Sequence, residues 1–450
     1  MRKLLFLSYP FPPLGAAGAL RPFRFAKYLP EFGWLPFVLT IRERKDVPKD
    51  YSLLKELPSS VNIIRTRMFY PAMLWDKIAS LTRQRTKPKR LTVEKPRKVW
   101  VLPNSGRCSA RQVTKRFLLS LISTPDHHIF WFPFAIRACT QIVKEHNISG
   151  LMTTSPPHSS HLVGLAVKKI SRLPWIVDFR DPWVDNFKLR EDMLPWQKRV
   201  EKKLERLIVE NADAVIANTK TNMDMLIKRY PYLSQDKFIT IRNGFEDISS
   251  TGRERSFNKF TITHTGIFYP MVNPYFFFEA LREWLSSKGE NTRRNTRVLL
   301  VGETKEGETK DVIKSLQLED VVKFVPRLPH RKALSIARMS DLLLVSLGFD
   351  SRNAGWVPMK VYDYLGCKRP ILAFLPEGEA AALIRKAKAG SVITSPDFKT
   401  TQKVLDTTYD KKLNHGRSLC NFDPETNEID LFNVKNLTFK LASVLQSITK

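Results

Sequence analysis

The chain has 450 residues, which is too long for one ordinary hydrophobic core, so we expect two or three domains. Hydrophobic residues make up 43% of it and charged residues 26%, as in globular proteins, and this composition excludes a wholly disordered chain. Lysine and arginine total 74 against 44 acidic residues, a formal charge of +30 that favours polyanionic partners such as nucleic acid, anionic lipid headgroups or a phosphorylated substrate.

The N-terminal residues share one feature with secretion signals, because Arg2 and Lys3 precede an apolar run. That run stops at Ser8 and is followed by three prolines without a small-residue cleavage pattern, so we predict a buried strand over residues 3–8. The longest apolar runs, such as residues 117–122, are too short to span a bilayer. Four separated cysteines without a CxxC pair predict reduced thiols and a cytoplasmic protein.

Short apolar strands alternate with helical stretches through the first 250 residues. The strands are predicted at residues 3–8, 36–40, 150–154, 175–178, 214–217 and 238–241. Helical spacing of apolar residues is found over residues 19–31, 135–145, 161–170 and 198–209. Strands separated by helices predict parallel βαβ units, with a sheet covered on both faces.

A basic insert at about residues 65–125 interrupts this alternation. Between Arg65 and Arg116 there are fifteen basic residues, and Asp76 and Glu94 are the two acids. The large apolar side chains that open the segment are Phe69, Tyr70, Met73, Leu74 and Trp75. Basic residues beside exposed aromatic rings suit an anionic membrane surface. A solvated loop is the alternative, and the sequence leaves both open.

A second alternation follows the turn signal at residues 241–245 and the polar linker at residues 246–259. Its strands are predicted at residues 261–265, 298–301, 321–324, 342–345, 371–373 and 391–393, and residues 431–448 have helical spacing. We therefore predict an α/β fold with two Rossmann-like lobes, residues 1–250 and 256–430, followed by a C-terminal helix at residues 431–450. Ligands of such sheets bind beyond the carboxyl ends of the strands, so the two lobes should face a central cleft.

Candidate site residues of the first lobe follow predicted strand ends. Gly15 and Gly18 allow the backbone of the first loop to approach a ligand, although a tight turn alone would also need them. His158 follows two prolines that end a strand, and a histidine bonded to a nearby carbonyl is the alternative. Asp178 and Arg180 leave the next strand, where concentrated charge favours a functional role over a local ion pair that supports a loop.

Candidate site residues of the second lobe suit an anionic ligand. Gly266 ends its first strand, and Arg327 follows the strand at residues 321–325. Pro358 begins a helix, whose free N–H groups favour a diphosphate. Lys360 would reach the same anion, and Asp363 would accept hydrogen bonds from ribose hydroxyls. An ordinary surface position is the alternative for each residue taken alone.

Several kinds of chemistry have no support in the sequence. It contains no zinc-spaced Cys/His cluster, HExxH, GxSxG or GxxxxGK[ST] motif, which leaves hydrolytic triads and P-loop chemistry without support. No recognition-helix or RRM signature accompanies the basic charge, so nucleic acid is not the expected partner.

In their order along nearly the whole chain, these segments resemble the retaining glycosyltransferases of the GT-B fold, especially the family 4 (glycosyl transferases group 1) enzymes. The segments that carry the resemblance are Tyr-Pro-Phe-Pro-Pro at 9–13 with Gly15, Gly18 and Arg21, Phe-Ala-Lys-Tyr-Leu at 25–29, Thr-Ser-Pro-Pro-His at 154–158, Asp-Phe-Arg-Asp-Pro-Trp at 178–183 and Val-Pro-Met-Lys-Val-Tyr-Asp-Tyr-Leu at 357–365. The resemblance implies that the first lobe binds the acceptor, that the second binds a nucleotide-sugar, and that the last helix crosses back to the first lobe.

The chain departs from the family pattern at the implied donor site. Relatives often carry two glutamates with seven residues between them, where this chain has Gly355 and Asp363. Relatives also carry a basic pair where residues 271–273 are Met-Val-Asn. Arg327 or Lys360 would therefore have to bind the diphosphate here.

The resemblance implies transfer of a sugar from a nucleotide-sugar to an acceptor, with no cofactor and no metal required, because fixed cations and a helix dipole can stabilise the departing diphosphate. His158, Asp178 and Arg180 would position the sugar or the acceptor. The basic insert points to a glycan or lipid-linked acceptor in cell-surface polysaccharide synthesis, and to a peripheral position on the inner face of a membrane. A sugar-nucleotide epimerase of the same fold and a non-catalytic polyanion-binding protein are the alternatives.

Overall fold

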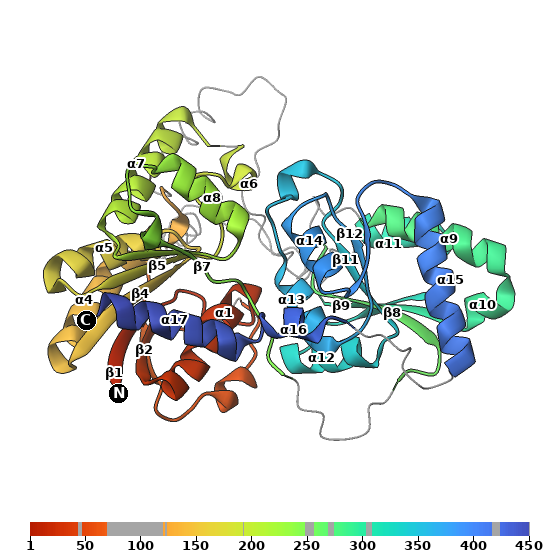
Figure 1. The fold of residues 1–450 in the computed structure, drawn as a ribbon, viewed down its shortest axis with the longest axis horizontal. Helices are drawn as coiled ribbons and strands as arrows, with labels where there is room; N and C mark the ends of the chain where they lie inside the picture. The colour runs from red at the N-terminus through yellow and green to blue at the C-terminus, as the bar shows by residue number, and fades with distance from the viewer. Residues whose placement is uncertain are drawn as a thin grey trace, which may run out of the picture.

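The computed structural model describes residues 1–43, 47–69, 120–121, 124–191, 193–247, 256–268, 274–302, 308–415 and 424–449. Most of the basic insert lies outside these residues, so its predicted role at a membrane stays a prediction. So does the lobe boundary near residue 255. Figure 1 shows two lobes side by side, each a sheet with helices around it.

The N-terminal lobe contains a seven-stranded parallel sheet with the order β3-β2-β1-β4-β5-β6-β7. Its strands are β1 (Arg2–Leu7), β2 (Trp34–Ile41), β3 (Asn62–Thr66), β4 (Ile148–Ser155), β5 (Trp175–Phe179), β6 (Ala214–Ala217) and β7 (Phe238–Thr240). Its helices are α1 (Ala17–Tyr28), η1 (Leu29–Phe32), η2 (Leu53–Glu56), η3 (His127–Trp131), α4 (Phe132–Glu145), α5 (Ser159–Ser171), α6 (Phe187–Arg190), α7 (Pro195–Asn211), α8 (Lys220–Arg229) and η4 (Gln235–Lys237). The central strands are buried because helices cover both faces.

The C-terminal lobe contains a six-stranded parallel sheet with the order β10-β9-β8-β11-β12-β13. Its strands are β8 (Phe260–Thr265), β9 (Thr296–Val301), β10 (Val322–Val325), β11 (Leu342–Ser346), β12 (Ile371–Phe374) and β13 (Gly390–Ile393). Its helices are α9 (Tyr275–Lys288), α10 (Glu290–Arg294), α11 (Glu308–Ser315), α12 (His330–Met339), η5 (Ser351–Asn353), α13 (Met359–Cys367), α14 (Glu379–Lys386), α15 (Phe398–His415) and α16 (Thr426–Asp430). The predicted fold class, two Rossmann-like lobes with parallel sheets, is confirmed.

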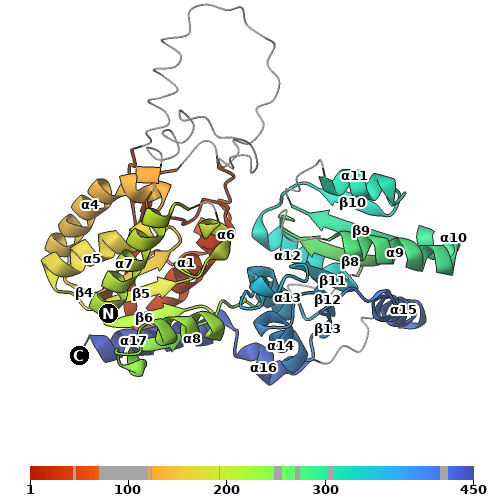
Figure 2. The ribbon, with the colours of Figure 1, turned by 90° about the horizontal axis from the view of Figure 1, so that it is seen from above.

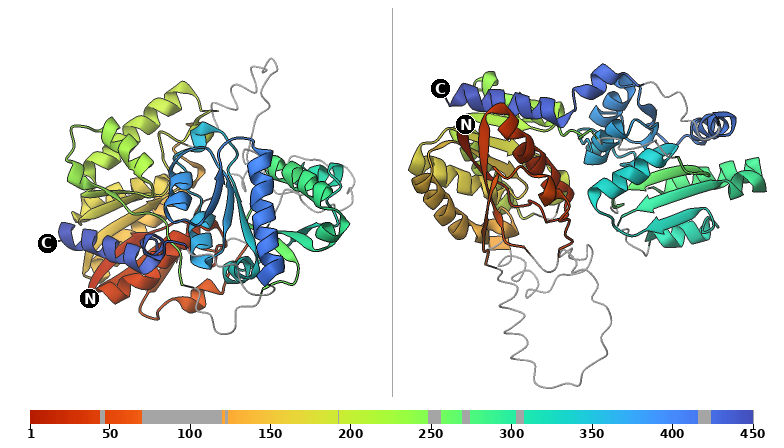
Figure 3. Two further views of the ribbon diagram at one scale, coloured as in Figure 1. Left: turned by 45° about the vertical axis from the view of Figure 1, so that its right-hand side comes forward. Right: turned by 90° about the horizontal axis from the view of Figure 1, so that it is seen from below.

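The last helix, α17 (Val434–Ile448), belongs to the core of the N-terminal lobe. Leu437, Leu441 and Leu445 recur on one face of α17 and pack with Leu4 and Phe6 of β1. Figures 2 and 3 show this helix, in blue, against the lobe that begins the chain. The chain thus crosses from the second lobe back to the first.

None of the helices that the structure describes has both the length and the apolar character needed to cross a lipid bilayer. Two of the four cysteines, Cys139 and Cys367, are among the described residues, and both are buried free thiols.

Candidate functional site

A buried ion pair joins β5 to α1 at the carboxyl end of the N-terminal sheet. Arg21 donates from Nε to Oδ2 of Asp178 at 3.0 Å and from Nη2 to Oδ1 at 2.7 Å. Thr154 also donates to Oδ2 of this carboxylate, at 2.8 Å. Asp178 does not pair with Arg180, and the local ion pair that was the alternative forms instead between Nε of Arg180 and Oδ2 of Asp181, at 3.7 Å. Both oxygens of Asp178 are already bound by the guanidinium of Arg21, which is 157 residues away in sequence.

Arg180 instead binds the first turn of α1, which contains Gly18. Its Nη1 donates to the carbonyl of Gly18 at 2.5 Å, and its Nη2 donates to the carbonyl of Pro156 at 3.4 Å. A Cβ atom at residue 18 would overlap this guanidinium, so any other residue would force the side chain of Arg180 to shift. The structure thus brings together two predicted site residues, Gly18 and Arg180, and gives the glycine a packing reason.

His158 is buried at the N-cap of α5, three residues after β4 ends. Its ring stacks on Trp183 with centroids 4.6 Å apart and an interplanar angle of 3°. Neither ring nitrogen has a hydrogen-bond partner among the residues that the structure describes, so no nearby carbonyl satisfies it. Burial, together with His161 and Arg180, lowers the pKa of His158 well below its usual value. The neutral ring retains a donor and an acceptor for a ligand hydroxyl.

Lys360 approaches the end of β8 from the first turn of α13. Its Nζ lies 2.9 Å from Nε2 of His264 and would be 3.5 Å from a Cβ atom at Gly266, whose φ is +102°. Nδ1 of His264 lies 2.9 Å from the carbonyl of Leu344. Since a carbonyl can only accept, Nδ1 of His264 carries its proton and Nε2 accepts from Lys360. Burial lowers the pKa of Lys360 to about 7.

Pro358 is the N-cap of α13, and its carbonyl accepts from the backbone N–H of Val361 at 3.0 Å. The first N–H groups of a helix have no partner within it, so this helix start offers donors to an anion beside Lys360. Pro358, Lys360 and Gly266, which we predict to bind the donor, therefore lie close together.

Arg327 and Gly15 face each other across the two lobes. A Cβ atom at Gly15 would lie 3.4 Å from Nη2 of Arg327 and 3.2 Å from the carbonyl of Pro48. Arg327 comes from the loop between β10 and α12, and Gly15 from the loop between β1 and α1. These two predicted donor-binding residues therefore lie together, and their role in donor binding stays a prediction. Residues 271–273 lie outside the described residues.

Asp363 is engaged in an ion pair between the lobes. Nη2 of Arg24, on α1, donates to its Oδ1 at 2.9 Å, and Nε2 of His330 lies 3.7 Å from its Oδ2. In this structure the carboxylate therefore binds the other lobe, and its predicted contact with a ribose stays untested. Gly355 faces Thr221 of α8, whose Cγ2 would be 2.8 Å from a Cβ atom at that glycine.

The charged residues that surround this pair were not predicted from the sequence. Glu246 accepts from Lys27 at 2.6 Å and lies 3.6 Å from Nε of Arg24. Glu56 accepts from Lys27 at 2.7 Å and also binds Arg331 of α12. A usable signal was present, since Arg21, Arg24 and Lys27 recur every three residues and therefore share a face of α1.

Comparisons with known proteins agree with this architecture. Residues 98–247 match the family model described as Glycosyltransferase Family 4. No curated protein matches the chain.

Three solved structures are similar over nearly their full length. Sucrose-phosphate synthase from Thermosynechococcus elongatus is 12% identical, with 99% of each chain covered and a TM-score of 0.61. Anabaena HepE in complex with UDP and glucose is 15% identical, with 99% and 100% covered and a TM-score of 0.60. WaaG, a glycosyltransferase involved in lipopolysaccharide biosynthesis, is 13% identical, with 98% and 99% covered and a TM-score of 0.57. The resemblance inferred from the sequence is therefore confirmed: the chain has the fold of the GT-B glycosyltransferases, and its residues 98–247 match Glycosyltransferase Family 4.

Proposed function

We propose that this protein transfers a sugar, as a hexosyltransferase that retains configuration, from a nucleotide-sugar to an acceptor. The observation that carries the proposal is the cation of Lys360 beside the start of α13 and the glycine that ends β8. The Anabaena HepE structures that the chain resembles contain UDP or UDP-glucose, which supports a nucleotide-sugar as the donor.

The chemistry of the leaving group explains why such a site would catalyse transfer. When the bond between the anomeric carbon and the diphosphate oxygen breaks, negative charge develops on the departing diphosphate. A nearby ammonium and the free N–H groups of a helix stabilise that charge more in the transition state than in the ground state. Lys360 and the helix that Pro358 begins would supply both, with Arg327 reaching from the adjacent loop, so the reaction requires no metal ion.

The N-terminal lobe would bind the acceptor and orient the reacting sugar. Neutral His158, whose ring nitrogens have no hydrogen-bond partner in the described part of the chain, would bind a sugar hydroxyl. Asp178 acts through Arg21 as a positioning residue, because both of its oxygens are engaged. A glycan or lipid-linked acceptor in cell-surface polysaccharide synthesis, reached at the inner face of a membrane, agrees with the basic sequence and with the similarity to WaaG.

Thermal unfolding in the presence of UDP-, GDP- and ADP-sugars tests this proposal. A donor at about 100 times its Kd adds ~2.7 kcal/mol to the free energy of unfolding, so one of them should raise the Tm by a few degrees. Lys360→Ala should abolish the shift, whereas Lys332→Ala, an exposed lysine of α12, should keep it. No shift with any nucleotide-sugar would contradict the proposal.

Product analysis separates transfer from the alternatives. With a labelled nucleotide-sugar and no acceptor, a transferase should release the nucleotide slowly or leave the donor intact. An epimerase would convert the donor to a second nucleotide-sugar. Tight, salt-sensitive binding of polyanions without turnover of any donor would indicate the binding protein instead.

A further inference from the structure

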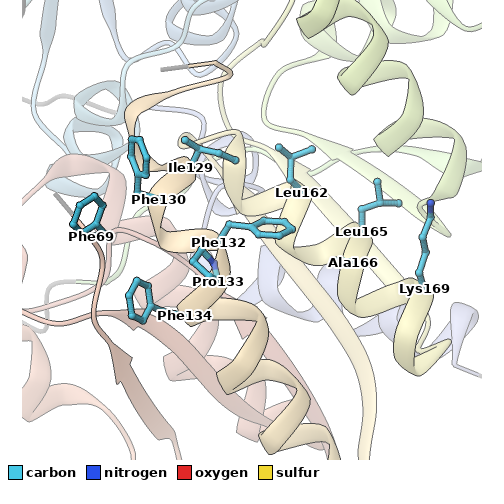
Figure 4. Close-up of a pocket in the computed structure, with 10 residues that line it drawn as sticks. All are labelled: Phe69, Ile129, Phe130, Phe132, Pro133, Phe134, Leu162, Leu165, Ala166 and Lys169. Carbon is cyan, nitrogen blue, oxygen red and sulfur yellow. The ribbon is translucent and has the colours of Figure 1, made fainter. Parts of the chain in front are cut away.

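An apolar pocket of about 720 Å³ lies between η3, the start of α4 and α5 in the N-terminal lobe. Figure 4 shows its lining as sticks: Phe69, Ile129, Phe130, Phe132, Pro133, Phe134, Leu162, Leu165, Ala166 and Lys169. Nine of these ten side chains are apolar, and Lys169 alone is charged. A pocket of this size suits a small-molecule ligand, but it lacks the several convergent polar groups that orient a polar one.

The two sides of the pocket come from different sequence patterns. On α5, Leu162, Leu165, Ala166 and Lys169 recur at helical spacing and so form one face of that helix. The other wall comes from consecutive residues at the start of α4, where the helix begins. Phe134 remains 39% exposed and Phe69 remains 45% exposed, so aromatic rings stand at the open end of the pocket. Exposed aromatic clusters of this kind mark interaction sites.

The pocket is separate from the residues that connect the lobes. Figures 1 and 2 show α4 and α5 on the side of the N-terminal lobe away from the C-terminal lobe. The helix η3 connects the pocket to the residues that follow β1. It contributes Phe130 to the lining, and its His128 packs against Tyr9 with ring centroids 4.1 Å apart. A ligand seated in the pocket would therefore contact η3, the element that packs on Tyr9, without filling the site beside Lys360.

Charge complementarity indicates what kind of molecule the pocket binds. Figure 4 shows Lys169 at one end of the lining and Phe69, Phe130 and Phe134 at the other. Lys169 forms no ion pair with the residues that the structure describes. The sequence that follows Phe69, residues 70–119, contains thirteen lysines and arginines and two acids. An apolar chain joined to an anionic headgroup matches both this lining, with its single lysine, and the basic sequence that follows Phe69.

We propose that this pocket seats a hydrocarbon chain of a lipid in an anionic bilayer. The acyl chain would replace water against the phenylalanine rings, and the headgroup phosphate would lie near Lys169. Such a pocket would bring the acceptor lobe into contact with a membrane. The lipid contact itself does not depend on the proposed transfer reaction, but its use in reaching a lipid-linked acceptor does.

Photolabelling tests the proposal with the full chain. Vesicles of equal parts phosphatidylglycerol and phosphatidylcholine would carry a trace of phosphatidylglycerol with a diazirine in its acyl chain. Irradiation should label peptides from α4 and α5, and vesicles of phosphatidylcholine alone should give much weaker labelling. No nucleotide-sugar takes part, so the result is independent of the thermal-shift test of donor binding.

Two variants and a matched control locate the contact. Phe134→Ser should lower vesicle binding and labelling of α4 and α5 about fivefold, since it removes a ring that would become buried. Ala166→Trp should have a similar effect by filling the pocket from α5 without changing charge. Phe324→Ser removes a ring with 38% exposure from β10 of the other lobe and should leave both readouts unchanged. Circular dichroism would confirm that each variant is folded.

Other occupants would give different results, each of which would overturn the proposal. If a second copy of the chain covered the pocket, sedimentation velocity would show a dimer that Phe134→Ser dissociates. If a segment of the chain itself filled it, α4 and α5 of the unmodified protein would not be labelled. Equal labelling of all variants would mean that the lipid contact lies elsewhere.

Discussion

Nζ of Lys360 lies 2.9 Å from Nε2 of His264, a histidine whose other ring nitrogen donates to the carbonyl of Leu344. His264 can therefore accept a hydrogen bond from Lys360 but cannot neutralise its charge. An anion bound at the start of α13 would supply the missing negative charge and raise the pKa of Lys360 from about 7. Donor binding and protonation of this lysine should thus be coupled.

The affinity for the donor should fall as the pH rises above about 7, because the free protein then loses the Lys360 proton that the complex retains. At most, the affinity for the donor should fall about tenfold for each pH unit, and this fall should end at the pKa that Lys360 has in the complex. Isothermal titration calorimetry in buffers of different ionisation enthalpy should show proton uptake on binding. Lys360→Arg, which stays charged, should remove this pH dependence; an unchanged slope would contradict the coupling.

The same lysine should affect stability in the ligand-free protein. Its pKa is lower in the folded state than the ordinary value of about 10.4, so the unfolded chain binds more protons between about pH 7 and 10. This group therefore adds stability as the pH rises through that window. Lys360→Met should flatten the rise, as measured by urea unfolding at several pH values, and the exposed Lys332→Met should not.

Asp178→Asn should destabilise the protein by about 3–5 kcal/mol, because it leaves the buried guanidinium of Arg21 without its counter-charge. Asp181→Asn is the matched control: its carboxylate is partly exposed and lies 3.7 Å from Arg180, so the expected change is below about 0.5 kcal/mol. Denaturant unfolding measures both. A double variant, Arg21→Met with Asp178→Leu, should be less destabilised than Asp178→Asn, and a larger loss would refute the unpaired-charge explanation.

Glu246→Gln should reduce the sensitivity of the protein to acid. Burial alone would raise the pKa of Glu246, but Arg24, Lys27 and Arg331 lower it to about 2. A carboxylate with a depressed pKa stabilises the fold above its unfolded value near 4.5, and that contribution is lost as the pH falls towards 2. The variant should be less stable at pH 7 and show a shallower loss below about pH 4.5. The exposed Glu279→Gln should behave like the unmodified chain.

Gly18→Ala, in the first turn of α1, should destabilise the protein more than Gly15→Ala in the preceding loop. The added methyl group at residue 18 would overlap the guanidinium of Arg180, whereas at residue 15 the nearest atom would be 3.2 Å away. We expect a loss of about 1–2 kcal/mol for Gly18→Ala and less than half of that for Gly15→Ala. In the background of Arg180→Ala the effect of Gly18→Ala should vanish, and full additivity of the two changes would show that they act separately.

The sequence predicted the strands well where both faces of the sheet are covered. Residues 214–217 were predicted as a strand and form β6 with the same bounds, because a continuous apolar run indicates a buried parallel strand. The edge strand β3 was missed, since its residues 62–66 are partly exposed and include Asn62 and Arg65, so neither a continuous apolar run nor a regular alternation is present.

The site was predictable only where local sequence determines it. Gly266 and Lys360 were predicted because each follows a strand end or helix start that the sequence itself indicates, and the structure places them side by side. Arg21 as the partner of Asp178 was not found, since no local pattern shows which distant arginine the sheet topology brings to a carboxylate. The apolar pocket was missed for the same reason: it forms only when the aromatic start of α4 meets one face of α5.

The place of α17 in the core of the N-terminal lobe has a consequence for the order of folding during synthesis. Leu4 and Phe6 are among the first residues to leave the ribosome, but Leu441 and Leu445, which complete the same buried cluster, are among the last. The N-terminal lobe should therefore wait with an uncovered apolar surface while the other lobe is made, although domains usually fold in order of their emergence. A nascent chain arrested near residue 430 should bind chaperones through that surface and release them once the remaining residues emerge.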